Sequence, residues 1–270
     1  MSKNITTILI SFVICFVSCN SISKNFESDD KDSLVIQLIT YVLDQAHYLD
    51  IEIGDDFSEK VFYSFLENID PYKRYLYQSD IDILSKYKYE IDDSFNQPNL
   101  EFFNLAYEIL TQRIDESKQI SQEVLSKPFD FQLEETFNFD IEELQYVNSR
   151  IDLVDRWRKL MKVYLIENYH DEIKEDERTF KKDSTFKLRS YSKIEIETRE
   201  ILNETMADYF VIMEEEFQRQ HWFSIYLNSF VSQYDPNTSY LDPEDRDRFN
   251  IDMSGNYAGI GAVLRKKVDK

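Results

Sequence analysis

Apolar residues recur every three or four positions along most of this chain, and glycine is almost absent from the same stretch. The sequence has four glycines in 270 residues, and three of them, Gly255, Gly259 and Gly261, fall within the last sixteen. A spacing of three and four places apolar side chains on one face of an α-helix, whereas a half-buried strand needs strict alternation. The pattern therefore predicts a mainly α-helical bundle up to the last glycine cluster.

The apolar repeat divides into helical segments that are bounded by capping and stop signals. Asp56 and Asp140 are each followed three residues later by glutamate, which is the pattern of a capping box at a helix start. Pro71 ends the second segment, because proline cannot continue a helix. The predicted helical segments are 33–49, 56–69, 79–95, 98–114, 140–161 and 192–232. Residues 171–190 are highly charged, and we expect a solvated hairpin or a helix extension there.

Each predicted helix has an apolar face that we expect to point into the core. The core should be rich in rings, because the chain contains 20 Phe and 18 Tyr and its hydrophobic content is 42%. In the first segment the predicted buried face consists of Leu34, Leu38, Tyr41, Val42 and Leu49. In the segment from residue 140 it consists of Leu144, Val147, Ile151, Val154, Trp157 and Met161.

Two segments of the chain resemble each other. In each, an aromatic-rich helix ends at an Asp-Pro pair, Asp70-Pro71 or Asp235-Pro236, and a Tyr-Leu pair follows. Proline blocks the helix, and the aspartate can accept hydrogen bonds from backbone amides of the turn. A repeated helix stop explains both segments, and a tandem repeat is the alternative.

The first twenty residues have the pattern of an export signal. Lys3 precedes an apolar stretch over residues 5–17, which is shorter than the roughly 20 residues that a membrane span needs. The stretch ends in Phe16-Val17-Ser18-Cys19, which resembles a bacterial lipobox. We predict a lipoprotein-type signal peptide over residues 1–18, lipidation of Cys19 and a polar tether over residues 19–30. The alternative is ordinary cleavage after Ser18 or Ser21. Either reading predicts a bacterial envelope protein of the periplasm, and lipidation would anchor it to the membrane.

Charge restricts the partners of the chain. A formal net charge of -21 repels phosphate backbones and anionic headgroups, so we expect no nucleic acid partner and membrane contact only through a lipid anchor. Both cysteines, Cys15 and Cys19, lie in or just after the apolar stretch, which leaves no disulfide framework in the remainder.

Signals for chemistry are weak throughout the sequence. His47, His170 and His221 lie far apart and lack the short spacing of a metal site. The acidic cluster at residues 242–247 lacks the turn glycine of a calcium loop. Ser254 precedes a glycine, but no lysine or histidine lies nearby in sequence to activate it as a nucleophile. We therefore predict no metal, no cofactor and no catalytic residue within this chain.

Three segments near the C-terminus carry a family resemblance. They are YDPNTSYLDPED at 234–245, FNIDMSG at 249–255 and GIGAVL at 259–264. Together they resemble the junction at which the helical N-terminal domain of tail-specific (C-terminal-processing) proteases passes into a PDZ domain. The segment DPYKRYLYQSDI at 70–81 is similar to the first helix-end motif of the same family. The resemblance places residues 31–245 in the helical domain, and residues 246–270 in a linker and the first strand of a PDZ domain.

The resemblance implies a function for the full-length protein. Members of this family are envelope serine endopeptidases that degrade or trim proteins selected by their C-termini. The implied partners are protein substrates with exposed C-termini, with an adaptor protein as a further candidate. A PDZ domain captures a tail with backbone N–H groups and added strand pairing. Gly259, Ile260, Gly261 and Ala262 take that role by resemblance, and the alternative is that they only turn the chain into a strand.

The chain ends before a PDZ domain could be completed, because a lone strand leaves its backbone groups unpaired. We therefore expect a truncated or excised N-terminal piece, with the catalytic serine and lysine beyond it and no peptide hydrolysis of its own. Two alternatives remain. One is a non-catalytic helical envelope lipoprotein that acts as an interaction or adaptor module. The other is a metal- or ligand-binding envelope protein.

Overall fold

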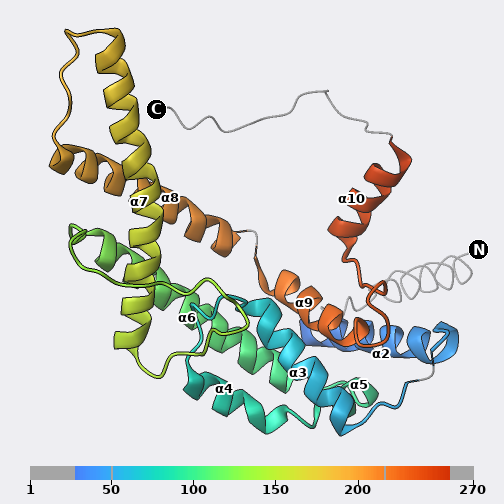
Figure 1. Cartoon of the computed structure of the whole chain (residues 1–270). Helices are drawn as coiled ribbons and strands as arrows, with labels where there is room; N and C mark the ends of the chain where they lie inside the picture. The colour runs from blue at the N-terminus through green and yellow to red at the C-terminus, as the bar shows by residue number, and fades with distance from the viewer. Residues whose placement is uncertain (1–27, 50, 216, 256–270) are drawn as a thin grey trace, which may run out of the picture.

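The computed structural model describes residues 28–49, 51–215 and 217–255, and within these residues the chain is built from helices (Figure 1). The elements are α2 (Ser28–Ala46), α3 (Asp55–Ile69), α4 (Gln78–Leu84), the 3₁₀ helix η1 (Ser85–Tyr87), α5 (Ile91–Asn96), α6 (Glu101–Leu125), α7 (Arg150–Lys182), α8 (Tyr191–Glu215), α9 (Arg219–Val231) and α10 (Pro243–Ser254). One isolated bridge joins Tyr77 to Val147. The predicted mainly helical class is confirmed, whereas the predicted strand at 259–264 lies outside the described residues.

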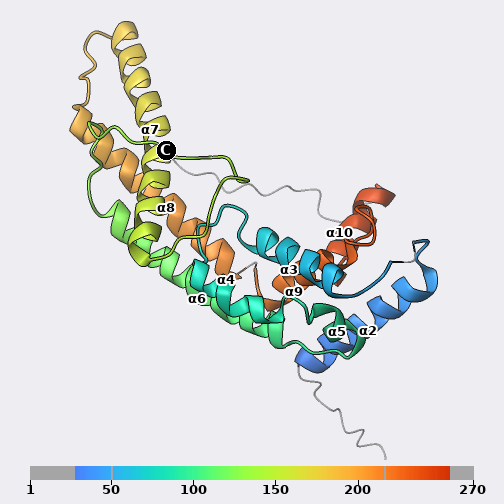
Figure 2. The same ribbon diagram turned by 60° about the horizontal axis from the view of Figure 1, so that its bottom comes forward.

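The helices form two packed groups that share α6. In the first group α3 packs on α5 and α9, α2 packs on α5, and α6 contacts α9. In the second group α6, α7 and α8 pack pairwise on one another. Figure 2 shows α6 running along the molecule from one group to the other. The long helix α6 therefore ties the two groups into one core.

Aromatic rings fill the core of the first group. The rings of Phe95 and Phe230 stack in parallel with their centroids 3.5 Å apart, and Phe57 meets Phe230 edge-on at 5.0 Å. Tyr226 is fully buried and contacts the rings of Phe65, Phe95, Phe102, Phe103 and Phe223. Edge-on and offset ring pairs stabilise a core beyond their buried area. The prediction of a ring-packed core is confirmed.

The second group extends into a long helical hairpin. Trp157, Met161 and Leu165 of α7 are fully buried, and the ring of Trp157 packs on Phe210 of α8. Beyond this core α7 and α8 continue to a turn at which Arg189 binds three carboxylates. They belong to Glu172 at 2.8 Å, Asp176 at 2.6 Å and Glu197 at 2.8 Å. The charged segment 171–190 is thus both a helix extension and a hairpin turn, as predicted.

The helix predicted from residue 140 begins later than expected. Residues 140–148 form turns and a bridge, and α7 starts after Ser149, whose Oγ accepts a hydrogen bond from the Asp152 amide at 3.3 Å. The predicted inward residue Ile151 is 81% exposed, whereas Trp157 and Met161 are buried as expected. The capping pair Ser149 and Asp152 is the start signal, and it takes precedence over the pattern at Asp140.

Two predicted helices are divided in the structure. The segment 79–95 is split into α4, η1 and α5. Of its apolar residues, Leu84, Ile91 and Phe95 are buried and Ile81 is partly buried. The segment 192–232 is split into α8 and α9 between Glu215 and Arg219. One straight helix could not serve both groups, because α8 packs in the second group while α9 is buried on nearly all sides in the first.

The predicted face of α2 is wrong. Leu34, Leu38, Tyr41, Val42 and Leu49 are exposed, and the buried apolar residues of this helix are Ile36 and Leu43, on another face that also holds the buried Asp32. The helix is apolar around most of its circumference, so the spacing alone does not select which face is buried. Among the helices that the structure describes, none is long and apolar enough to cross a membrane.

Candidate functional site at the second Asp-Pro turn

The second Asp-Pro turn is closed by its own aspartate. The chain leaves α9 at Val231, and Asp235 Oδ1 accepts a hydrogen bond from the Asn237 amide at 2.7 Å. The backbone carbonyl of Asp235 accepts another from the Thr238 amide at 2.9 Å. α9 ends at Val231, four residues before Asp235, so Pro236 lies in the turn itself and the Asp235 carboxylate holds that turn.

Side chains just beyond the end of α2 hold this turn against the body. The Tyr48 hydroxyl donates to Asp235 Oδ2, and His47 Nε2 lies 3.3 Å from Thr238 Oγ1. The hydrogen bond from Tyr48 lowers the pKa of Asp235, and the same bond raises the pKa of Tyr48. The turn is therefore joined to a segment nearly two hundred residues earlier in the chain.

The pair formed by His47 and Thr238 is a structural contact rather than a nucleophile and its base. His47 Nδ1 lies 3.2 Å from the Leu49 amide nitrogen and 3.4 Å from the Leu49 carbonyl oxygen, so this ring nitrogen contacts the neighbouring backbone. The base of a hydroxyl nucleophile is instead oriented by a third side chain. The imidazole is also fixed by ring contacts with Tyr48 at 4.9 Å and Tyr234 at 5.3 Å.

Asn228 fixes the chain after the turn. Its side-chain Nδ2 donates to the Tyr240 carbonyl at 3.0 Å, and its Oδ1 accepts from the Tyr240 amide at 2.8 Å. Two residues later Asp242 Oδ1 accepts from the Asp245 amide at 2.8 Å and caps α10. The side-chain amide of Asn228 thus forms hydrogen bonds with both the N–H and the carbonyl of Tyr240, as a neighbouring strand would.

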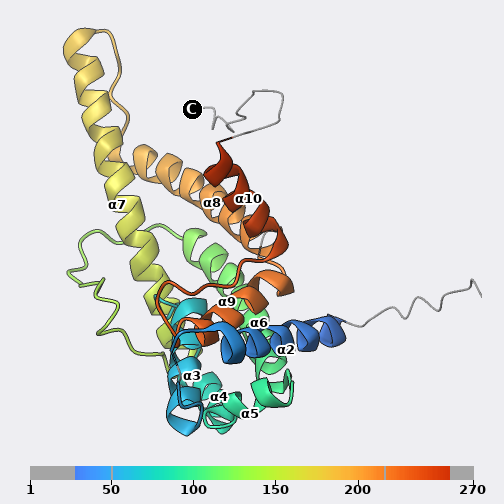
Figure 3. The ribbon, with the colours of Figure 1, turned by 90° about the vertical axis from the view of Figure 1, so that its right-hand side faces the viewer.

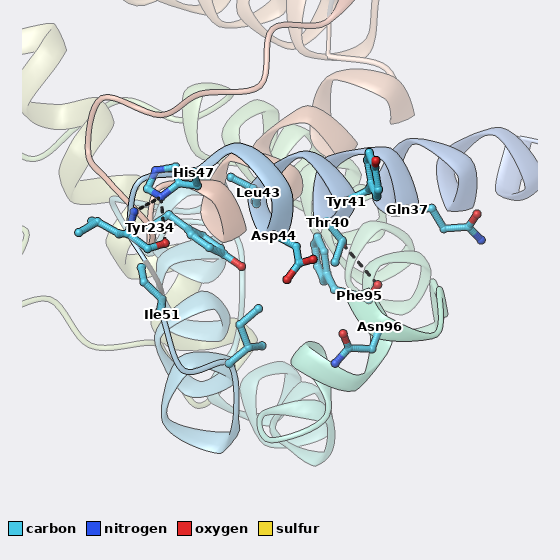
Figure 4. A pocket seen from close by; sticks show the side chains of 12 residues that line it. Gln37, Thr40, Tyr41, Leu43, Asp44, His47, Ile51, Phe95, Asn96 and Tyr234 are labelled. Carbon is cyan, nitrogen blue, oxygen red and sulfur yellow. Dashed lines mark hydrogen bonds between the residues drawn. The ribbon is translucent and has the colours of Figure 1, made fainter.

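A cavity of about 740 Å³ lies beside the turn, between the second half of α2, α5 and the ring of Tyr234 (Figure 4). Its walls mix apolar and polar side chains, and they are Gln37, Thr40, Tyr41, Leu43, Asp44, His47, Leu49, Ile51, Ile53, Phe95, Asn96 and Tyr234. The Thr40 hydroxyl donates to the Ile36 carbonyl at 2.9 Å, and burial raises the pKa of the Tyr234 hydroxyl. Asp44 and His47 both belong to this lining, but their hydrogen bonds go to other partners. Asp44 Oδ2 accepts from Gln45 Nε2 at 2.6 Å, and His47 Nε2 lies 3.3 Å from Thr238 Oγ1.

The first Asp-Pro turn has the same backbone hydrogen bond, from the Lys73 amide to the Asp70 carbonyl at 3.0 Å, but its aspartate lies deeper and has a different set of partners. Asp70 is fully buried and accepts hydrogen bonds from three successive amides, Arg74 at 2.9 Å, Tyr75 at 3.0 Å and Leu76 at 2.9 Å. Burial raises the pKa of this carboxyl, and the three amide bonds act against that rise. The prediction that the helix ends at its Asp-Pro pair is confirmed for α3, which ends at Ile69, whereas α9 ends four residues before Asp235.

The residues predicted to have a role at the C-terminus or the N-terminus lie outside the described part. These are Gly259, Ile260, Gly261 and Ala262, predicted to bind a substrate tail, and Cys19, predicted to be lipidated. Within the described part, no three His, Cys, Asp or Glu side chains come together as a metal site. Ser254 is exposed at the end of α10 and donates to the Ile251 carbonyl of the same helix at 3.2 Å.

Sequence reasoning missed Tyr48 and Asn228, which hold the turn and the chain after it. Neither residue lies in a recognisable motif, since their partners are 187 and 12 positions away. The sequence held one signal for a further donor at this turn. An aspartate that accepts a backbone amide of its own turn still has a second carboxylate oxygen that can accept another hydrogen bond.

Comparison with known proteins agrees with this architecture. The family model described as the tail-specific protease N-terminal domain matches residues 39–244. The chain belongs to this family. It is also 29% identical over 242 residues to the tail-specific protease of Haemophilus influenzae, a match that covers 89% of this chain and 32% of that protein.

Family membership confirms the resemblance to tail-specific proteases, and the matched region holds the segment at 70–81 and nearly all of that at 234–245. The segments at 249–255 and 259–264, which also carried the resemblance, lie beyond the matched region. The matched region begins inside α2 and ends at the first turn of α10, so it includes both turns and the helices between them. The chain spans about a third of the length of the curated relative that it matches.

Proposed function

We propose that this chain is the N-terminal helical platform of an envelope serine endopeptidase that degrades or trims proteins selected by their C-termini. The observation that supports it is the match of the tail-specific protease N-terminal domain over residues 39–244. In this proposal the catalytic serine and its lysine base lie in sequence beyond the chain, and the 270 residues alone hydrolyse no peptide bond.

The geometry of the second Asp-Pro turn supports a platform role. Tyr48 and Asn228 hold the segment that leads into α10, so the chain leaves the helical body in a fixed direction. A domain that follows α10 would thereby start from a defined point on the body. We propose that Gly259, Ile260, Gly261 and Ala262 begin such a domain and present backbone amides to the carboxylate of a substrate tail.

The polypeptide translated from the complete reading frame tests the proposal. We expect it to degrade an unfolded reporter that ends in apolar residues at least tenfold faster than the same reporter ending in two aspartates. A serine-reactive inhibitor should stop the reaction. Equal rates for the two tails, or turnover that the inhibitor leaves unchanged, would contradict the proposal. A reading frame without a protease domain would favour the non-catalytic lipoprotein instead.

Cys19 supports a proposal about location. We propose that its thiol is lipidated after removal of residues 1–18 and that the platform stands on a membrane of the bacterial envelope through the tether at 19–30. Replacing it, Cys19→Ala, should move the protein from the membrane fraction to the soluble fraction, because a lipid chain supplies the binding free energy. Cys15→Ala is the matched control and should fractionate like the unchanged protein. Membrane association of the Cys19→Ala variant would exclude the lipid anchor.

A further inference from the structure

A small cavity beside the first Asp-Pro turn is lined by two arginines and by apolar side chains. Its volume is about 260 Å³, and it lies between the turn at residues 72–74, the loop at 137–144 and the first half of α7. Besides Arg74, Arg156 and the polar Asn138, its walls are Tyr72, Phe137, Phe139, Leu144, Leu160 and Tyr164. No acidic side chain is part of this lining, in a chain that carries 52 acidic residues.

Neither arginine has a carboxylate partner within ion-pair distance in the part of the chain that the structure describes. Arg74 donates through Nη2 to the Tyr209 hydroxyl at 2.6 Å, and its buried Nε has no hydrogen-bond partner. Arg156 donates through Nη2 to the Gln145 carbonyl at 2.7 Å and through Nη1 to the Lys73 carbonyl. Other partly buried arginines, Arg113 and Arg189 among them, form ion pairs with carboxylates.

The carboxylates that influence these arginines electrostatically are already engaged. Asp70 acts on both guanidinium groups and accepts the three amides of its own turn. Asp152 also acts on Arg156, and its Oδ2 accepts from the Ser149 hydroxyl at 2.7 Å. Holding two guanidinium groups partly out of water without a direct counter-ion is costly, and a bound anion would offset that cost.

We propose that this cavity binds the carboxylate of a ligand whose body is apolar, such as an aromatic or branched amino acid with a blocked amine. The carboxylate accepts hydrogen bonds from Arg74 and Arg156, which suit carboxylates because of their planar donor geometry. The apolar body packs on the rings of Tyr72, Phe139 and Tyr164. A volume of about 260 Å³ is at the small end of ligand pockets and suits a single residue. This inference does not depend on the proposed function.

Calorimetric titration of the chain with two matched probes tests the chemistry. N-acetyl-phenylalanine carries the carboxylate, and N-acetyl-phenylalaninamide has the same body without the charge. We expect the acid to bind at least tenfold more tightly than the amide. Equal affinities, or no binding of either probe at millimolar concentration, would overturn the proposal.

Variants locate the site. Arg156→Gln should weaken binding of the acid at least tenfold, whereas Lys159→Gln removes a cation from the same helix outside this cavity and should change the affinity less than twofold. Phe139 is 62% exposed, so Phe139→Trp should leave the fold intact while it narrows the cavity, and we expect at least a fivefold loss. This second variant keeps the test valid if Arg156→Gln does not fold. Unchanged affinity in the folded variants would overturn the assignment.

A peptide arm distinguishes the two sources of such a carboxylate. A tetrapeptide that ends in phenylalanine is titrated with a free and with an amidated C-terminus. Binding of the free peptide alone supports the site as a receptor for polypeptide ends. Binding of N-acetyl-phenylalanine without binding of either peptide supports the site as a receptor for small free carboxylates.

Discussion

At the scale of single residues, carboxylates that accept several hydrogen bonds determine where the loops lie. Glu135 is in the loop between α6 and α7, and it accepts from Arg158 Nη1 at 2.9 Å and from Lys162 Nζ at 2.7 Å. Arg158 Nη2 binds the second carboxylate oxygen, so the contact is bidentate. These hydrogen bonds, with that from Arg158 first, lower the pKa of Glu135 from its ordinary 4.5 to about 2.

Replacing this carboxylate should reduce stability in a pH-dependent way. Because the folded pKa lies below the unfolded one, the stabilisation by Glu135 is complete above about pH 5 and is lost as the pH falls toward 2. Glu135→Gln should lower the free energy of unfolding by roughly 1 to 2 kcal/mol at pH 7, and the difference should shrink at pH 3.5. Urea unfolding at both pH values measures it.

The neighbouring exposed residue supplies the control. Glu134 is exposed, and Glu134→Gln removes the same charge from the same loop, so its effect should stay within about 0.5 kcal/mol at either pH. A loss for Glu135→Gln that is the same at pH 7 and pH 3.5 would show that the charge on Glu135 is not what holds the loop.

At the scale of elements, α9 connects the core to the segment that leaves it. It is buried between α3 and α6 through Phe223, Tyr226 and Phe230, and its Asn228 satisfies both backbone groups of Tyr240. The side chain of Asn228 thus joins the chain before α10 to the ring-packed core through two hydrogen bonds.

Removing this side chain should release the segment. Asn228→Ala leaves the amide and carbonyl of Tyr240 without their partner, which should cost about 1 to 3 kcal/mol. Hydrogen exchange at the Tyr240 amide should become at least tenfold faster, while core amides of α3 keep their rates. Asn203→Ala, an exposed change of the same kind on α8, should leave exchange at Tyr240 unaltered. Unaltered exchange in Asn228→Ala would mean that other contacts hold the segment.

The sequence predicted those elements best that have a single apolar face. In α3, for which the spacing predicts one apolar face, the apolar residues of that face are all buried: Phe57, Val61, Phe62, Phe65, Leu66 and Ile69. In α2 apolar residues cover most of the circumference, so the packing of neighbours decided which face is buried. No proline or glycine lies between α8 and α9, so the sequence gives no local signal for this break. The break arises because α8 and α9 pack in different groups of helices.

The candidate site was predictable only in its local part. The Asp-Pro pairs predicted both turns, because the aspartate and its amides are close in sequence. The contacts of Tyr48 and Asn228 depend on how distant helices pack, and no local pattern encodes them. The cavity of Arg74 and Arg156 likewise forms only when α7 packs against the first turn.

At the scale of the whole molecule, the α7–α8 hairpin and α10 rise from the same side of the body (Figures 1 and 3), and in the view of Figure 1 they lean away from each other. The hairpin is stiffened at its turn by Arg189, and α10 starts from the segment that Asn228 holds. This arrangement suits a platform that supports further domains.

The central claim is that the helical domain is the non-catalytic part of a C-terminal-processing protease, and turnover of an unfolded reporter with an apolar free tail tests it most directly. The 270-residue chain and the polypeptide from the complete reading frame are assayed side by side at equal concentration. The account predicts turnover by the longer polypeptide and none by the 270-residue chain. Turnover by the 270-residue chain alone, or none by the longer polypeptide, would contradict it.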